Sequence, residues 1–460
     1  MKYRIESDTL GAVKIPEKAL WGPQTQRSIN NFKIGVPNSM PIEIIRAYSV
    51  LKKSCAKANH ELNILDNKKM KLISDVCDEI HDGIHDNEFP LVIWQTGSGT
   101  QTNMNVNEVI SNRSNVILNK SLLDDKFLKA NDDVNMSQSS NDTFPTAINI
   151  AVTKLIIEKT IVSIEKFIKT LNSKVEEFNN DIKIGRTHLM DATPLTLGQE
   201  FSGYESQIIH GLKSLKNTLP HLKELAIGGT AVGTGLNAPL NFDKIVVENI
   251  SHQTNIDFKP AENKFESIAS NDALVESHGA LKQIAVSLFK IANDIRLMGS
   301  GPRSGFAELI LPSNEPGSSI MPGKVNPTQC EALSMVCTQI MGNDTTVTIA
   351  GSQGHLELNV FKPVLAHKLI ESAHLIADAC ESFNENCLKG LKANKEKIKE
   401  HVDNSLMLVT ALNKKIGYYK AAEIANNAYK NGTTLRHESI KSGYVGEKEF
   451  DEWIKPENMI

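Results

Sequence analysis

The chain has 460 residues and a net charge of −4, with 50 basic and 54 acidic side chains. This balance leaves no excess of basic side chains for binding nucleic acid. No apolar run reaches the roughly 20 residues that span a membrane. The charged start, residues 1–6, predicts no signal peptide. We therefore expect a cytoplasmic protein that binds neither nucleic acid nor membrane.

Helical periodicity dominates the chain. Aromatic residues make up only 5% of it, which favours helices over β-sandwiches and barrels. Residues 42–86 are predicted helical, and residues 143–178 would form a helix of roughly 50 Å. Residues 1–45 show turn signals, and residues after about 395 predict short helices. The pattern of a helix-bundle seam indicates five long helices, at 143–178, about 200–225, 272–298, 327–345 and 363–388.

The six cysteines show no CxxC pair. Their spacing places several of them on the apolar faces of the expected helices. We expect buried thiols in a reducing compartment rather than a disulfide framework or a metal centre. The cysteines are Cys55, Cys77, Cys330, Cys337, Cys380 and Cys387.

Three polar segments come before helices or interrupt them. Residues 94–105 combine glycines with hydroxyl and amide side chains, which suits a small polar ligand, although a capped turn would explain them too. Residues 137–142 hold more hydroxyls and amides than one N-cap needs. His188 lies in an expected turn, 185–190, where a structural or exposed histidine is the alternative to a catalytic one, and Pro194 is expected to restart a helix.

The most informative stretch is 317–327, Gly-Ser-Ser-Ile-Met-Pro-Gly-Lys-Val-Asn-Pro. Its glycines and prolines, with Pro312 and Pro316 before it, predict a long loop over 311–326. Asn326 and Pro327 suit the start of the following helix. A lysine beside a helix N-terminus attracts carboxylates. We expect a loop that closes over an anionic substrate and carries a reactive hydroxyl.

This stretch resembles the signature of the fumarase/aspartase lyase superfamily. Residues 328–331, Thr-Gln-Cys-Glu, and residues 24–27, Gln-Thr-Gln-Arg, are similar to class II fumarases in particular. The resemblance implies an all-α, three-domain fold: an N-terminal domain 1–138, a central domain 139–395 with the catalytic loop 311–326, and a small C-terminal domain 396–460. It also implies that the long five-helix bundle forms the core of a homotetramer whose active sites combine residues from three subunits.

The resemblance implies reversible hydration of fumarate to L-malate, a step of the tricarboxylic acid cycle, with no metal and no cofactor. Ser318 would remove the C3 proton, giving an aci-carboxylate that Lys324 and Asn326 stabilise, and loop amides would favour its charged form. His188 would handle the water, and Glu331 would orient His188. The substrate-binding residues implied are Ser98, Gly99, Thr100, Ser139, Ser140, Asn141, Thr187, Ser319, Lys324, Val325 and Asn326.

A second anion site is implied at Lys129, Ala130, Asn131 and Asp132. In fumarases an arginine and a histidine contribute to this neighbourhood. This chain has Lys126 and Lys129 instead. Lysine keeps the positive charge but has neither the guanidinium fork nor a ring that titrates near neutral pH.

Two alternatives remain open. An aspartate ammonia-lyase has the same fold and carbanion chemistry with an amine leaving group, and residues 24–27 and 328–331 argue against it. A non-catalytic structural protein of the superfamily is the other alternative, and the intact set of Ser318, Lys324, Asn326, His188 and Glu331 argues against that.

Overall fold

The structure is a computed structural model that describes residues 2–460, and it is mainly helical, as predicted. It divides into two compact units. The first comprises Met1–Val162, Lys213–Gln283 and Gln339–Ala377, with the structural description starting at residue 2. The second comprises Ser163–Leu212, Ile284–Thr338 and Asp378–Ile460. The predicted domain limits at 138 and 395 stay predictions.

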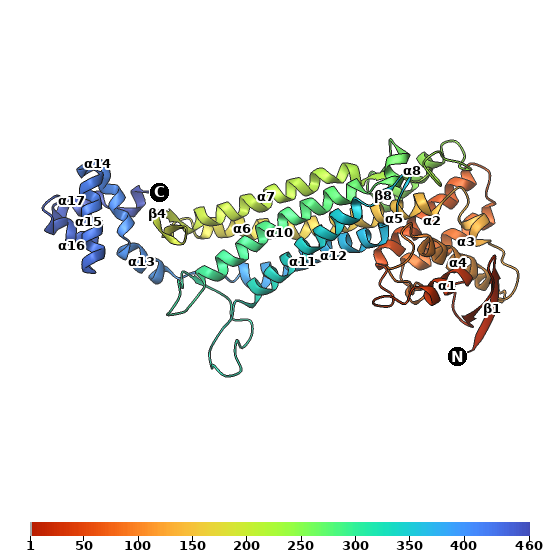
Figure 1. Cartoon of the computed structure of the whole chain (residues 1–460), viewed down its shortest axis with the longest axis horizontal. Helices are drawn as coiled ribbons and strands as arrows, with labels where there is room; N and C mark the ends of the chain where they lie inside the picture. The colour runs from red at the N-terminus through yellow and green to blue at the C-terminus, as the bar shows by residue number, and fades with distance from the viewer. Residues whose placement is uncertain (1) are drawn as a thin grey trace. The chain divides into compact units, whose positions relative to one another are not determined.

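The first unit begins with an antiparallel hairpin that the sequence patterns did not predict. Strands β1 (Tyr3–Asp8) and β2 (Gly11–Pro16) pair around a short turn and pack beside α1 (Pro23–Asn31). Helix α2 (Ile42–Glu61) then packs against α3 (Asn67–His81), α5 (Ser140–Leu155) and α8 (Phe242–Thr254), and α4 (Thr100–Ile117) joins the same group (Figure 1).

The five predicted long helices are present. The first is α5, continued by a π-helical turn η3 (Ile156–Thr160) into α6 (Ile161–Glu177). The others are α7 (Leu197–Leu222), α10 (Asp272–Met298), α11 (Thr328–Gly351) and α12 (Lys362–Phe383). Within residues 2–460, none of the helices has the length and apolarity needed to cross a membrane. All six cysteines are buried and unpaired, as expected.

Side-chain contacts tie these helices together inside each unit. In the first unit, the buried His278 of α10 contacts Asp344 of α11 at 3.1 Å and Ser372 of α12 at 2.9 Å. In the second, ring contacts join α6 to α12 and α6 to α7, and hydrogen bonds join α7 to α10 and α11 to α12. These pairs are Phe167–Phe383, Phe178–Phe201, Tyr204–Asp294 and Gln329–Ser382.

The second unit adds two features that the site uses. Residues 182–196 form a hairpin of β3 (Ile182–Thr187) and β4 (Met190–Thr196), so Pro194 lies in a strand and the expected helix starts later, at Leu197. The predicted loop is confirmed, since no helix or strand is assigned between β7 (Leu309–Ile310) and α11.

The remaining elements are short. Three are η1 (Asp86–Glu88), η2 (Ala130–Val134) and α9 (Lys264–Ala269), with the two-residue strands β5 (Glu224–Leu225), β6 (Lys259–Pro260), β8 (Gly354–His355), β9 (Leu358–Asn359) and β10 (Lys392–Ala393). After residue 383 come η4 (Asn384–Leu388), α13 (Lys395–Asn404), η5 (Leu406–Leu412), α14 (Asn413–Ile416), α15 (Tyr418–Asn431), α16 (Leu435–Lys441), α17 (Glu447–Trp453) and η6 (Pro456–Asn458). Most of these final helices share a small apolar core of their own.

One buried carboxylate holds the β3–β4 hairpin in place. Glu308 has no exposed surface and contacts Lys183 at 3.1 Å, Arg186 at 2.8 Å and His401 at 3.2 Å. Burial by itself raises the pKa of Glu308, but the hydrogen bond from Arg186 and the charge of Lys183 outweigh it and hold the pKa below 4.5. The base of the hairpin is therefore fixed by an ionised group.

We predict that Glu308→Gln lowers the free energy of unfolding by about 3–5 kcal/mol, because it leaves Arg186 without its counter-charge and leaves the buried Lys183 with Glu200 alone. Since the folded pKa lies below the ordinary value, the stabilising effect is present above pH 4.5 and disappears as the pH falls through the lowered pKa. Urea unfolding at neutral and acidic pH measures both effects. Glu400→Gln, on the exposed face of α13, is the control and should leave the midpoint unchanged; an equal effect of the two variants would contradict the prediction.

Candidate active site

Two helix N-termini meet in the first unit. Helix α4 begins at Thr100 and α5 begins at Ser140. The Asn103 amide of α4 donates to the Ser140 hydroxyl of α5 at 3.0 Å. Beside this contact, the Ser98 and Thr100 hydroxyls lie 2.8 Å apart. The positive ends of two helices and a group of hydroxyls therefore converge, as a carboxylate site requires.

Gly99 makes this convergence sterically feasible. Its φ of +74° lies in the left-handed region, and a Cβ atom there would be 2.2 Å from the Phe144 ring of α5. A glycine is therefore required on both counts. The turn that carries Ser98 and Thr100 lies directly against α5 for this reason.

Asp142 holds the start of α5. Ser139 and Asp142 form a capping box, in which the Ser139 backbone amide donates to Asp142 Oδ1 at 2.9 Å. The other carboxylate oxygen accepts from the backbone amides of Gly228 and Thr230 at 3.0 and 2.9 Å. Burial raises the pKa of Asp142 to about 7 although these amides lower it. The glycine-rich segment after β5, residues 228–230, therefore holds the N-terminus of α5 in place through Asp142.

The predicted turn that carries His188 is the tip of the β3–β4 hairpin. Thr187 pairs with Met190, so His188 and Leu189 form a two-residue connection with φ values of 56° and 62°. Such a turn normally takes Asn-Gly or a similar pair, and a leucine in left-handed conformation is strained. Both side chains are exposed. Strain at an exposed tip that local packing does not explain suggests a functional constraint.

The loop before α11 is closed on itself at its base. The Gly317 amide donates to the Lys324 carbonyl at 2.8 Å, and the Asn326 side chain donates to the Gly317 carbonyl at 2.6 Å. A Cβ at Gly317 would lie 2.3 Å from the Lys324 carbonyl oxygen, so the closure requires glycine. The Asn326 side chain therefore holds the base of the loop closed. The sequence patterns did not predict this structural role.

Ser318 lies inside this loop with its oxygen facing backbone donors. Its Oγ accepts from the amides of Ile320 and Met321 at 3.2 and 2.9 Å. Two N–H groups aimed at one hydroxyl oxygen stabilise negative charge on that oxygen. The amides that a serine base needs are therefore present. Ser319 and Val325 are exposed in the same loop.

Two charged residues next to Ser318 face solvent. Lys324 is exposed and has no ion-pair partner among the residues described. Glu331 lies in the first turn of α11 and is exposed too. Within residues 2–460 no hydrogen bond or ion pair joins Glu331 to His188, so the predicted contact between them is not made inside one chain.

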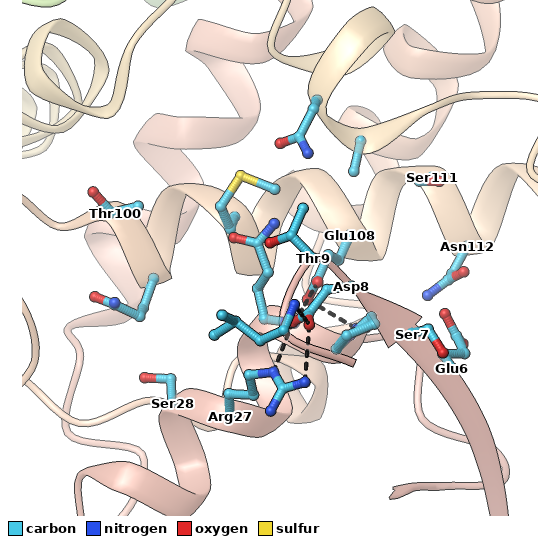
Figure 2. Close-up of a pocket in the computed structure, with 18 of the residues that line it drawn as sticks. Glu6, Ser7, Asp8, Thr9, Arg27, Ser28, Thr100, Glu108, Ser111 and Asn112 are labelled. Carbon is cyan, nitrogen blue, oxygen red and sulfur yellow. Dashed lines mark hydrogen bonds and ion pairs between the residues drawn. The ribbon is translucent and has the colours of Figure 1, made fainter. Parts of the chain in front are cut away.

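A cavity of about 640 Å³ lies beside α1, α4 and the β1–β2 hairpin, and Thr100 lies on its edge (Figure 2). Three residues of the predicted second anion site line it, namely Lys129, Ala130 and Asn131, together with Lys126; Asp132 is exposed and does not line it. On its wall the buried Glu108 accepts from the amides of Gly22, Gln24 and Thr25. This carboxylate holds the segment that carries the 24–27 motif.

Each cation of this cavity has its own acidic neighbour. Arg27 forms two hydrogen bonds with Asp8, at 2.7 and 2.9 Å (Figure 2). Lys129 contacts Asp125 at 2.5 Å. Lys126 donates to the Leu122 carbonyl and lies 4.0 Å from Glu6. The cavity therefore offers little uncompensated positive charge to a second anion.

The structure brings one group of the predicted residues together. Ser98, Gly99, Thr100, Ser139, Ser140 and Asn141 meet in the first unit, whereas Thr187, His188, the 317–326 loop and Glu331 belong to the second. In the part of the chain that the structure describes, no cluster of three or more His, Cys, Asp or Glu side chains could hold a metal ion.

Sequence reasoning missed several supporting residues. Asp142 could have been found from the Ser-x-x-Asp capping pattern. Asn103 lies in a motif that was recognised, but its contact with Ser140 depends on how two helices pack. Glu308 and Arg186 carry no local signal, because they are 122 residues apart in the chain.

Comparison with known proteins gives full-length matches. The model of a family described as lyase matches residues 11–342, and that of the fumarase C C-terminus matches residues 408–460. The chain is 60% identical to a class II fumarate hydratase of Pasteurella multocida, over 100% of this chain and 99% of the relative. It is 55% identical to a mitochondrial fumarate hydratase of Schizosaccharomyces pombe, over 100% of this chain and 88% of the relative.

The fold agrees with these matches. A crystal structure of class II fumarase from Schistosoma mansoni superimposes with a TM-score of 0.97 at 44% identity, covering 100% of this chain and 99% of the other. Sequence identity and fold thus agree over the whole length, and the family models agree over residues 11–342 and 408–460. The chain belongs to the class II fumarate hydratase family of lyases.

Proposed function

We propose that this chain catalyses the reversible hydration of fumarate to L-malate, as a lyase of the hydro-lyase type. The observation that carries the proposal is 60% identity over the full length to a class II fumarate hydratase. The substrate is a small dicarboxylate. The paired helix N-termini and the polar loop supply fixed donors of the kind that a dianion needs.

The binding role falls to the α4–α5 junction. Ser98, Thr100, Ser140 and Asn141 hold one substrate carboxylate by hydroxyl and amide hydrogen bonds, and Ser139 caps the helix beneath it. Lys324 and Asn326 hold the carboxylate next to C3. Donors fixed before the substrate arrives stabilise the more highly charged transition state most strongly.

Dehydration of L-malate begins with Ser318, whose Oγ, in the alkoxide form, takes the C3 proton and becomes a hydroxyl. The electron pair of the C–H bond moves into the neighbouring carboxylate and gives an aci-carboxylate. The C2–O bond then breaks, His188 on the opposite face protonates the departing hydroxyl, and water and fumarate leave. Glu331 orients His188. The two amides that point at Ser318 Oγ support its role as the base.

We also propose that four copies form a homotetramer with composite sites. The sequence resemblance supports this, and so do exposed apolar side chains on bundle helices. Ile209, Val286, Met335 and Ile349 are 44%, 52%, 67% and 56% exposed. Apolar side chains at this level of exposure suit burial against other subunits. We place the enzyme in the cytoplasm. The second anion site is weakened, because Lys126 and Lys129 are engaged by groups of their own chain.

The first test is ultraviolet absorbance of fumarate formed from L-malate with a chelator present, with L-aspartate in a parallel cuvette. We predict fumarate from L-malate alone. Fumarate from L-aspartate alone would make the chain an ammonia-lyase instead. No product from either substrate, in a well-folded assembly, would favour a non-catalytic member of the superfamily.

We predict that Ser318→Ala lowers kcat for L-malate by about 10²–10⁴-fold, because the C3 proton loses its acceptor. Steady-state kinetics measures the loss. Ser313→Ala, an exposed serine of the same 311–326 loop, is the control and should keep full activity. A Ser318→Ala variant with kcat within threefold of the parent would rule out this serine as the base.

We predict a comparable loss for His188→Asn, which removes the imidazole that donates the proton while an asparagine suits the left-handed turn. The variant should unfold at the same temperature as the parent, since the side chain is exposed. Thermal unfolding and kcat are measured on one preparation. Retained activity at unchanged stability would contradict the acid role.

A further inference from the structure

A buried asparagine of α4 joins α4 to α5 at the proposed substrate-binding junction. Asn103 has no exposed surface. Its amide nitrogen donates to Asn135 Oδ1 and to Ser140 Oγ, at 3.0 Å each, and its oxygen accepts from the Thr143 hydroxyl at 3.3 Å. A buried amide normally has such partners, but one of these partners is a proposed substrate-binding residue. The contact with Ser140 therefore bears on binding as well as on packing.

The orientation of the Asn103 amide is fixed by the group that it faces. Asn135 Oδ1 accepts from three nitrogen donors at 3.0, 3.2 and 3.1 Å, namely the side chains of Asn103, Asn107 and Lys52. The Asn135 nitrogen lies on the other side and donates to the Gln138 carbonyl at 3.2 Å. A reversed Asn103 amide would place its oxygen against the Asn135 oxygen, with no hydrogen between them. The Asn103 nitrogen therefore has to lie on the side where the structure places it.

Ser140 must consequently use its hydroxyl oxygen to accept the hydrogen bond from Asn103. A serine hydroxyl has one hydrogen, and within residues 2–460 the structure records no acceptor for the hydrogen of Ser140. The side chain is only half-buried, at the first position of α5. Its hydrogen is thus available to a substrate carboxylate, and the hydrogen bond that a hydroxyl accepts strengthens the one that it donates.

We propose that Asn103 is a positioning residue that directs the Ser140 hydroxyl to donate its hydrogen to a substrate carboxylate. The inference rests on the proposed function, since it assigns a role in binding the same dicarboxylate. Asn103 acts through Ser140 and touches no reacting atom. An aspartate of the same shape would do the opposite, because its oxygen would attract the Ser140 hydrogen inward and its charge would repel a dianion.

The test compares Asn103→Leu with Asn107→Leu. Leucine is similar in size to asparagine and has no donor, so the Ser140 hydroxyl loses the group that directs it. KM for L-malate should rise about fivefold, as for the loss of one hydrogen bond, with kcat changed less than twofold. Asn107 is the matched control, because it is equally buried and shares the acceptor on Asn135, but none of its recorded hydrogen bonds goes to Ser140. Asn107→Leu should keep KM within twofold of the parent.

Two outcomes of this comparison would overturn the inference. One is an unchanged KM in a folded Asn103→Leu enzyme. The other is an equal rise of KM in Asn103→Leu and Asn107→Leu, which would mean that KM responds to the buried amides in general rather than to the contact with Ser140.

A double-variant cycle separates positioning from a purely structural effect. If Asn103 acts through Ser140, adding Asn103→Leu to Ser140→Ala should raise KM by less than twofold beyond Ser140→Ala alone, whereas effects that multiply would overturn the inference. Should Asn103→Leu fail to fold, Asn103→Asp, which keeps the shape, takes its place in the cycle. Its effect on KM should be smaller in the Ser140→Ala background than in the parent, and equal factors in both backgrounds would count against the role of Asn103.

Calorimetric binding of succinate, a dicarboxylate with no leaving group, repeats the comparison without turnover. The Asn103→Leu enzyme should bind succinate about fivefold more weakly than the parent, and Asn107→Leu should bind it equally well. If the parent binds succinate but does not convert L-malate, the proposed function fails and the succinate series still decides the role of Asn103. Equal succinate affinity in the parent and Asn103→Leu, or no binding to the parent, would overturn that role.

Discussion

The packing of Gly99 against the Phe144 ring is the constraint on which the arrangement of the proposed substrate-binding residues depends. It brings the N-terminus of α4 against α5 so closely that a single methyl group would not fit. Ser98, Thr100 and Ser140 come together for this reason. The buried Asp142 then caps α5 and joins its start to the backbone amides of Gly228 and Thr230. The close contact of Gly99 with Phe144 and the buried carboxylate of Asp142 therefore both fix the start of α5.

The second unit obtains its reactive groups differently. His188 sits on a strained two-residue turn whose base is fixed by the buried Glu308, and Ser318 sits in a loop closed by Gly317 and Asn326. Both proposed reactive side chains thus lie on exposed segments, a two-residue turn and a long loop, whose bases are held by the contacts of Glu308 and Asn326. The proposed binding residues therefore lie at a packed junction of two helices, whereas the proposed catalytic residues His188 and Ser318 lie in a turn and a loop.

The sequence predicted what depends on local pattern. The long helices follow from apolar spacing, α10 at the predicted bounds 272–298, and the 311–326 loop follows from its glycines and prolines. The β1–β2 and β3–β4 hairpins were missed because their turns lack the usual Asn-Gly signal. Lys52 could not be singled out, since an isolated lysine in a helix is normally solvated; its burial depends on α2 packing against α5. Motifs identify the groups that we propose to contact the substrate, whereas packing alone reveals the buried polar groups beside them.

The central claim is that one active site takes its residues from several copies of the chain. His188→Asn and Ser318→Ala, each inactive alone, test it when the two variants are unfolded together, refolded as mixed tetramers and assayed with L-malate. If the two residues of a site come from different copies, some mixed sites contain both intact groups, and activity returns. If both residues come from one copy, every site carries one defect, and the mixed tetramers stay as inactive as either variant alone. We predict recovered activity; inactive mixed tetramers would contradict the account.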